Sequence, residues 1–224
     1  MKTKSPIAIR LDEIQSRIGK ALQPLGFKRK GRTFRRETDH EVLQIIALQA
    51  GPFEIGPPLP PQASHLRPDL YGKFTINLGV FVPEIYERTN PPIAMSRVIS
   101  DAHSSIRTRL PHIDEGEDIW WPILDSADED VEDILALLIH VGIPFLDRFR
   151  TRELIVRDWI SANQRIGRLD VAMILLRQGD KQGAKRLFEE HLQVSEAEGS
   201  EPYQVNHRRY VRELATKLGF GELS

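Results

Sequence analysis

The chain has 224 residues, of which 40% are hydrophobic and 28% charged, so it suits one large domain or a domain with an appendage. It contains no cysteine, which excludes disulfides, thiolate metal sites and a cysteine nucleophile. The formal net charge of -1 disfavours a general attraction to nucleic acid or to anionic membranes. No hydrophobic run reaches the roughly 18 residues of a membrane span, and the first residues lack the apolar segment of a signal peptide. We therefore expect a cytoplasmic protein with no membrane association.

The first predicted element is an amphipathic helix that begins at Ser5 and Pro6. Serine is a favoured N-cap, and proline is favoured in the first turn. Apolar residues then recur at spacings of three and four, and Pro24 and Gly26 end the pattern. We expect this helix to cover one face of a sheet.

Three segments follow before residue 73, and two of them are predicted strands. Residues 27–37 form a basic ribbon with a bulge or tight turn at Gly31. Residues 41–49 are apolar on both strand faces except for Gln44, which indicates a central strand. Residues 50–72 contain six prolines and three glycines. Because long irregular loops are usually functional or disordered, we interpret this segment as a mobile flap rather than an inert surface loop.

The clearest strand lies at residues 74–82, where apolar residues occupy every second position. The alternate positions are Thr75, Asn77, Gly79 and Phe81. We expect the apolar positions to be buried. The sequence leaves two alternatives for the second face: it is open, which favours binding, or it is covered by the C-terminal helices. At Gly79 another segment packs close to the backbone, or the strand bulges. Two more strands are predicted at residues 105–110 and 118–124.

The remaining elements are predicted helices. Ser126 is the expected N-cap of the first, Glu129 completes a capping box, and Gly142 to Pro144 end the helix. Further helices are predicted at about residues 151–164, 169–178, 181–198 and 203–218. The pair at 169–198 resembles a tetratricopeptide hairpin, but no second copy is present. This single hairpin favours a docked helical cap over a solenoid.

Together these elements predict an α+β fold, with an N-terminal helix packed on an antiparallel sheet of about five strands and an all-helical C-terminal half. We expect a sheet domain at residues 1–149. The helical extension at residues 150–224 is expected to dock on it.

A set of segments in fixed order resembles a known family over about residues 7–149. The segments are PLGFKRKGRTFRR, IIALQ, FTINLGVFV, HSSIRTRL, IWWPI and GIPFLDRF. They are similar to bacterial proteins described as domain of unknown function 4304. The resemblance implies a sheet domain over this range and brings no activity, cofactor or catalytic residue.

The basic ribbon is a candidate phosphate or nucleic-acid site. Its cations are Lys28, Arg29, Lys30, Arg32, Arg35 and Arg36. A second interpretation is an edge strand whose charges prevent edge-to-edge pairing. A third is neutralisation within the molecule, because residues 114–133 hold ten carboxylates and no lysine or arginine.

A second candidate site combines a histidine, two arginines and a tryptophan. Its residues are His103, Arg107, Arg109 and Trp121. Such a pocket could hold a carboxylate or phosphate group, against the alternative of solvated side chains on an edge strand. The carboxylates at 125–133 are explained by a helix start, and no HxxxH pair is present, so we expect no metal and no cofactor.

The sequence lacks the GxSxG, P-loop and GxGxxG signatures, which disfavours an enzyme of those common classes. Our leading hypothesis is a non-catalytic module that binds a protein or peptide through the open sheet face, with Phe81, a tryptophan and the flap at its border. The alternatives are nucleic-acid or phosphate binding by the ribbon, and a small-ligand receptor or enzyme at the second candidate site. A homodimer through a sheet edge or the last helices is compatible with the sequence.

Overall fold

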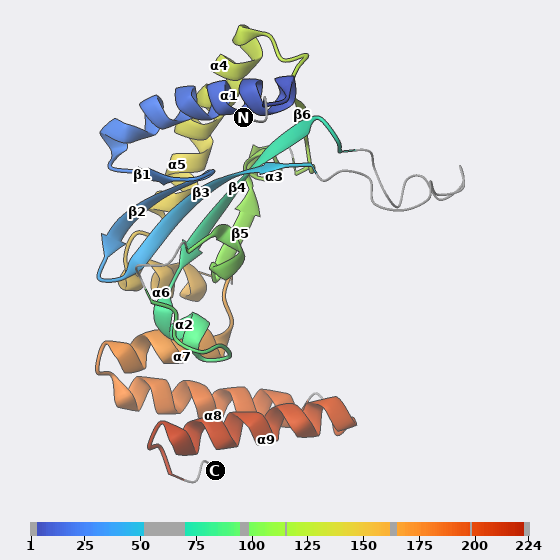
Figure 1. The fold of residues 1–224 in the computed structure, drawn as a ribbon. Helices are drawn as coiled ribbons and strands as arrows, with labels where there is room; N and C mark the ends of the chain where they lie inside the picture. Colours follow the sequence, from blue (N-terminus) through green and yellow to red (C-terminus); the bar gives the residue numbers. More distant parts are fainter. Residues whose placement is uncertain are drawn as a thin grey trace, which may run out of the picture. The chain divides into compact units, whose positions relative to one another are not determined.

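The computed structural model describes residues 4–51, 70–94, 99–114, 116–161, 165–197 and 199–221. The predicted α+β class is confirmed: an N-terminal helix, an antiparallel sheet and a largely helical C-terminal half are present (Figure 1). The chain divides into a sheet unit, Met1–Phe81 with Ala94–Arg150, and a helical unit, Val82–Ile93 with Thr151–Ser224. The predicted domain limits and the docking of the helical extension stay predictions. Most of the predicted flap lies outside the described residues.

The sheet has the strand order β1-β2-β3-β4-β5, with the short β6 also paired to β4. Its strands are β1 (Lys28–Lys30), β2 (Thr33–Asp39), β3 (Val42–Ala50), β4 (Lys73–Phe81), β5 (Ile106–Arg109) and β6 (Trp121–Pro122). All pairings are antiparallel. The long central pair β3 and β4 is buried on both faces, from Val42 to Leu48 and from Phe74 to Phe81. Burial on both faces confirms the central strand predicted at 41–49, but differs from the single buried face expected for β4.

One face of the sheet is covered by α1 (Pro6–Leu22), which continues into η1 (Gln23–Leu25) (Figure 1). The predicted N-cap is confirmed, because the Ser5 side chain accepts a hydrogen bond from the Ala8 N–H. The buried side of the helix carries Leu11, Ile14, Ile18 and Leu22. The helix lies close to the sheet at Gly19, where an added Cβ would be 3.2 Å from the ring of Phe34.

The same face is covered by α4 (Asp128–Leu137), η4 (Leu138–Gly142) and α5 (Ile143–Asp147). The predicted cap is wrong: Ala127 is the N-cap, and the Asp130 carboxylate accepts from its N–H at 2.7 Å, while Ser126 donates to the Pro122 carbonyl. The predicted end at Gly142–Pro144 is also wrong. The chain passes through a π-helical turn into α5, and this wider turn accommodates a proline that lacks a backbone donor.

The opposite face of the sheet is closed near its centre by η3 (Asp101–His103) and Ser104. An added Cβ at Gly79 would lie 2.3 Å from the Ser104 hydroxyl oxygen, so the glycine is required for this close approach. The Asn77 amide donates to Gln49 at 2.8 Å and to Asp101 at 3.0 Å. After β5 the chain forms α3 (Leu110–Asp114), a short helix that was not predicted.

The helical unit contains α2 (Pro83–Glu87), α6 (Arg152–Ile160), α7 (Arg168–Arg177), α8 (Lys181–Ala197) and α9 (Pro202–Lys217). A buried ion pair joins α2 to α6: the Arg152 Nε and Nη2 atoms donate to the two Glu84 carboxylate oxygens at 2.7 and 2.9 Å. Arg88 pairs with Asp170 of α7 at 2.8 Å. These charge-assisted contacts attach α2 to helices that come much later in the chain.

The close approach at Gly79 generates a prediction. The Gly79→Ala variant should lose about 1 to 3 kcal/mol of unfolding free energy, because its methyl group overlaps Ser104. Urea unfolding of the variant measures this loss. In a Ser104→Gly background the same substitution should cost less than half as much. An equal cost in both backgrounds would refute the contact as the cause.

Candidate functional site

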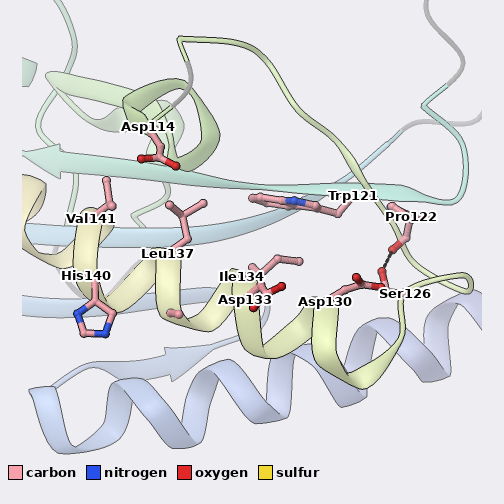
Figure 2. Close-up of a pocket in the computed structure, with 11 residues that line it drawn as sticks. Asp114, Trp121, Pro122, Ser126, Asp130, Asp133, Ile134, Leu137, His140 and Val141 are labelled. Carbon is pink, nitrogen blue, oxygen red and sulfur yellow. Dashed lines mark hydrogen bonds between the residues drawn. The ribbon is translucent and has the colours of Figure 1, made fainter.

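An open pocket of about 620 Å³ lies between α4–η4 and the segment that carries α3 and β6 (Figure 2). Its lining residues are Asp114, Trp121, Pro122, Ser126, Asp130, Asp133, Ile134, Ala136, Leu137, His140 and Val141. The volume falls within the range of roughly 300 to 1,000 Å³ that is typical of small-molecule binding pockets. All of these residues belong to the sheet unit.

The tryptophan of the pocket is positioned by the sheet. Trp121 pairs with Phe74 of β4, and the two ring centroids are 5.6 Å apart. Because directly paired residues share a sheet face, Trp121 lies on the face covered by α1 and α4. The Ile123 N–H donates to the Gly72 carbonyl at 2.8 Å and anchors the residues that follow β6. The indole is thus held above α4, half-buried (Figure 2).

The chemistry of the pocket is acidic and aromatic. Asp114, Asp130 and Asp133 line it, and none of the described residues around it is a lysine or arginine. Ile134 and Leu137 provide an apolar surface beneath the indole (Figure 2). An aromatic face and carboxylates above an apolar floor favour an organic cation over an anion.

The carboxylates of α4 are divided between two sides of the helix. Asp128 accepts from Arg10 at 3.1 Å and from Arg17 at 2.7 Å, and Arg17 also pairs with Glu132. The hydrogen bond from Arg10 is the main cause that lowers the pKa of Asp128. Asp130 and Asp133 face the pocket instead. Ion pairs of the acidic segment 114–133 are made by Arg10 and Arg17 of α1 and by Arg109 of β5.

The pleat of β1 and β2 divides the basic ribbon between the two sheet faces. Arg29 and Arg36 lie on the face covered by α1, whereas Lys28, Lys30 and Arg35 lie on the other. Arg29 donates to the Gln15 side chain at 3.1 Å and to the Gly31 carbonyl at 3.2 Å.

Arg36 belongs to a buried polar cluster rather than to an exposed ribbon. It donates to Gln44 at 2.9 Å and to the Leu25 carbonyl at 3.0 Å, and pairs with Asp147. The Gln44 side chain is fully buried and donates to the Leu146 carbonyl at 2.7 Å. Burial is the main cause that lowers the pKa of Arg36. Lys28, Lys30 and Arg32 are exposed, and phosphate binding by the ribbon stays a prediction.

In the second candidate site, Trp121 lies on the sheet face opposite to that of Arg107 and Arg109. His103 Nδ1 accepts from the Ser100 N–H at 3.1 Å and caps η3. Arg107 pairs with Asp101 at 3.5 Å on the sheet face opposite to that of Trp121. Arg109 pairs with Asp118, and its guanidinium carbon lies 5.1 Å from the centre of the Trp120 ring.

Phe81, expected at the border of an open face, is 1% exposed and therefore offers no ring surface to a partner.

Of the residues that line the pocket, Trp121 was predicted as a site residue from the sequence, whereas Asp130 and Asp133 were not. The sequence signal for these two carboxylates was their i,i+3 spacing, which places both on one side of α4.

No described helix is both long and apolar enough to cross a membrane.

The buried cluster at Arg36 gives a stability prediction. The Arg36→Ala variant leaves Gln44, Asp147 and the Leu25 carbonyl without their shared donor, which should cost about 2 to 4 kcal/mol in urea unfolding. The matched Arg32→Ala variant removes an exposed arginine of the same hairpin and should change stability by less than about 0.5 kcal/mol. Similar losses for both variants would contradict the assignment.

The Asp128 contacts predict a pH dependence. The pKa of Asp128 is lowered from 3.8 in the folded state. The ionised carboxylate therefore contributes fully to the unfolding free energy above pH 3.8, and this contribution is lost as the pH falls through the lowered pKa of the folded state. Asp128→Asn should therefore reduce the unfolding free energy at neutral pH, and the difference from wild type should vanish in acid. Urea titrations at low ionic strength test this, with Asp125→Asn as control. A difference that persists unchanged into acid would contradict the ionic origin.

Comparison with known proteins finds one family. Residues 61–148 match the model described as domain of unknown function (DUF4304), which confirms the resemblance over this range. A search of curated proteins found no match, and neither did a search of solved structures. The matching stretch contains every residue that lines the pocket. Over residues 61–148 the chain is therefore similar to the family described as domain of unknown function (DUF4304).

Proposed function

We propose that the pocket of Figure 2 binds a positively charged side chain of a protein or peptide, so that the protein acts as a non-catalytic interaction module. The observation that carries the proposal is that the Trp121 indole and the carboxylates Asp114, Asp130 and Asp133 line one pocket, together with the apolar Ile134 and Leu137. The proposed partner, a protein or peptide, is the one expected from the sequence. The proposed binding surface is the pocket beside α4 and not the sheet face.

The pocket suits the two parts of a lysine or arginine side chain. The aliphatic stem can lie on Ile134 and Leu137, and the charged end can reach the carboxylates. A cation over an indole gains about 0.5 to 2 kcal/mol, depending on how far it is desolvated. An arginine can also stack its planar guanidinium on the ring.

The surrounding charges support the same choice of ligand. Asp128 and Glu132 are held by Arg10 and Arg17 on the α1 side of the helix. The carboxylates on the pocket side include Asp133, which is exposed. Next to the pocket Leu124 is 53% exposed, which adds an apolar contact for residues that flank the bound cation.

Tryptophan fluorescence provides a direct binding assay. The chain has three tryptophans, and the variant Trp120→Phe with Trp159→Phe leaves Trp121 as the single indole. We expect a lysine- or arginine-rich peptide to change its emission in a saturable way, because the cation lies against the ring. The same peptide with acetylated lysines should bind at least about tenfold more weakly, since acetylation removes the charge.

Matched variants then locate the site. Asp133→Asn should weaken binding of the basic peptide by about threefold to tenfold, because it removes one carboxylate from the pocket. Glu129→Gln removes a carboxylate of α4 that does not line the pocket, and should leave affinity within about twofold. Equal binding of charged and acetylated peptides would refute the proposal, as would equal losses in the two variants.

A further inference from the structure

Two histidines of the helical unit lie in direct contact. A hydrogen bond joins the Nε2 atoms of His191 on α8 and His207 on α9, which are 2.8 Å apart. Their ring centroids are 5.1 Å apart, with the rings inclined at 74°. His207 is exposed and His191 half-buried, so solvent and ions reach the pair.

The two helices are held together independently of these rings. Arg208 is 9% exposed, and its Nη1 atom donates to the carbonyls of Ser195 at 2.6 Å and Gly199 at 2.8 Å. Arg212 of α9 pairs with Glu196 of α8 at 2.7 Å. The backbone positions of His191 and His207 are therefore set by neighbouring contacts, which preorganises the pair.

The separation of the two nitrogens indicates which ions the pair can chelate. Imidazole nitrogens lie about 2.0 to 2.1 Å from a bound divalent transition metal. Two such ligands at a right angle are about 2.9 Å apart, as in square-planar or octahedral coordination, whereas two tetrahedral ligands are about 3.3 Å apart. The observed 2.8 Å is close to the right-angled arrangement. A metal ion replaces the shared proton of this hydrogen bond, and both rings must turn so that their lone pairs meet at the ion.

We propose that His191 and His207 form a chelating site for a divalent transition-metal ion, with Cu²⁺ and Ni²⁺ preferred over Zn²⁺. No group of three or more His, Cys, Asp or Glu that could hold a metal occurs in the described part of the chain. Water therefore completes the coordination in this chain alone. Bound metal bridges α8 and α9 and stabilises the helical unit, because the pair exists only in the folded state.

Copper binding tests the proposal with the full-length, tag-free protein. Titration with Cu²⁺ alone, followed by electron paramagnetic resonance, should show one site with hyperfine coupling to two equivalent nitrogens. His191→Gln and His207→Gln should each remove one nitrogen coupling and weaken binding by about tenfold or more, because a chelate becomes a single ligand. His112→Gln, in α3, is the matched control and should leave spectrum and affinity unchanged.

Thermal unfolding supplies a second readout. Ni²⁺ should raise the melting temperature of the wild type and of His112→Gln, but not that of the His191→Gln and His207→Gln double variant. Circular dichroism of the metal-free double variant checks that it folds. A wild-type copper spectrum without two coupled nitrogens would overturn the proposal. So would Cu²⁺ affinities of the single variants equal to that of the wild type.

Discussion

The organisation of the sheet unit depends on one constraint: the central strands β3 and β4 are buried on both faces, so each face needs its own cover. On one side α1 and the continuous helical segment α4–η4–α5 provide the cover. On the other side the small turn at η3 reaches the strand because Gly79 has no side chain. Burial of this strand pair supplies much of the hydrophobic stabilisation of the unit.

Two amides buried in this core are hydrogen-bonded, whereas the buried hydroxyl of Thr75 has no hydrogen-bond partner. Gln44 interrupts the buried apolar segment from Val42 to Leu48 of β3, and its side chain is hydrogen-bonded to Arg36 and to the Leu146 carbonyl. Asn77 occupies the opposite face and is satisfied by Gln49 and Asp101. These contacts remove the desolvation cost of buried amides, and they tie the sheet edge and loops to its centre.

The acidic pocket is a consequence of the same packing. Helix α4 uses one side to bind the arginines of α1 and another to cover the sheet, which leaves Asp130 and Asp133 beside the indole on β6. The pocket combines residues of a strand with residues of a helix, and separate contacts hold each of these two elements in place. The paired histidines of α8 and α9 show the same principle in the helical unit, where Arg208 holds the helices that present them.

The sequence alone determined the elements with strong periodicity or clear end signals. It predicted the N-terminal helix with its Ser5 cap, the central strands, the antiparallel α+β class and the helices after residue 151, because side-chain spacing reports local geometry directly. It failed at the start and at the end of α4. The cap of α4 depends on Asp130 reaching back to Ala127, and passage through Gly142–Pro144 depends on a π turn packed against the sheet. Only the tertiary structure decided that β4 is buried on both faces and that the cations of the basic ribbon are divided between the two faces of the sheet. It also decided that Trp121 lines a pocket with carboxylates rather than with arginines. The reason is that strand register and helix docking bring together residues that no spacing along the chain relates.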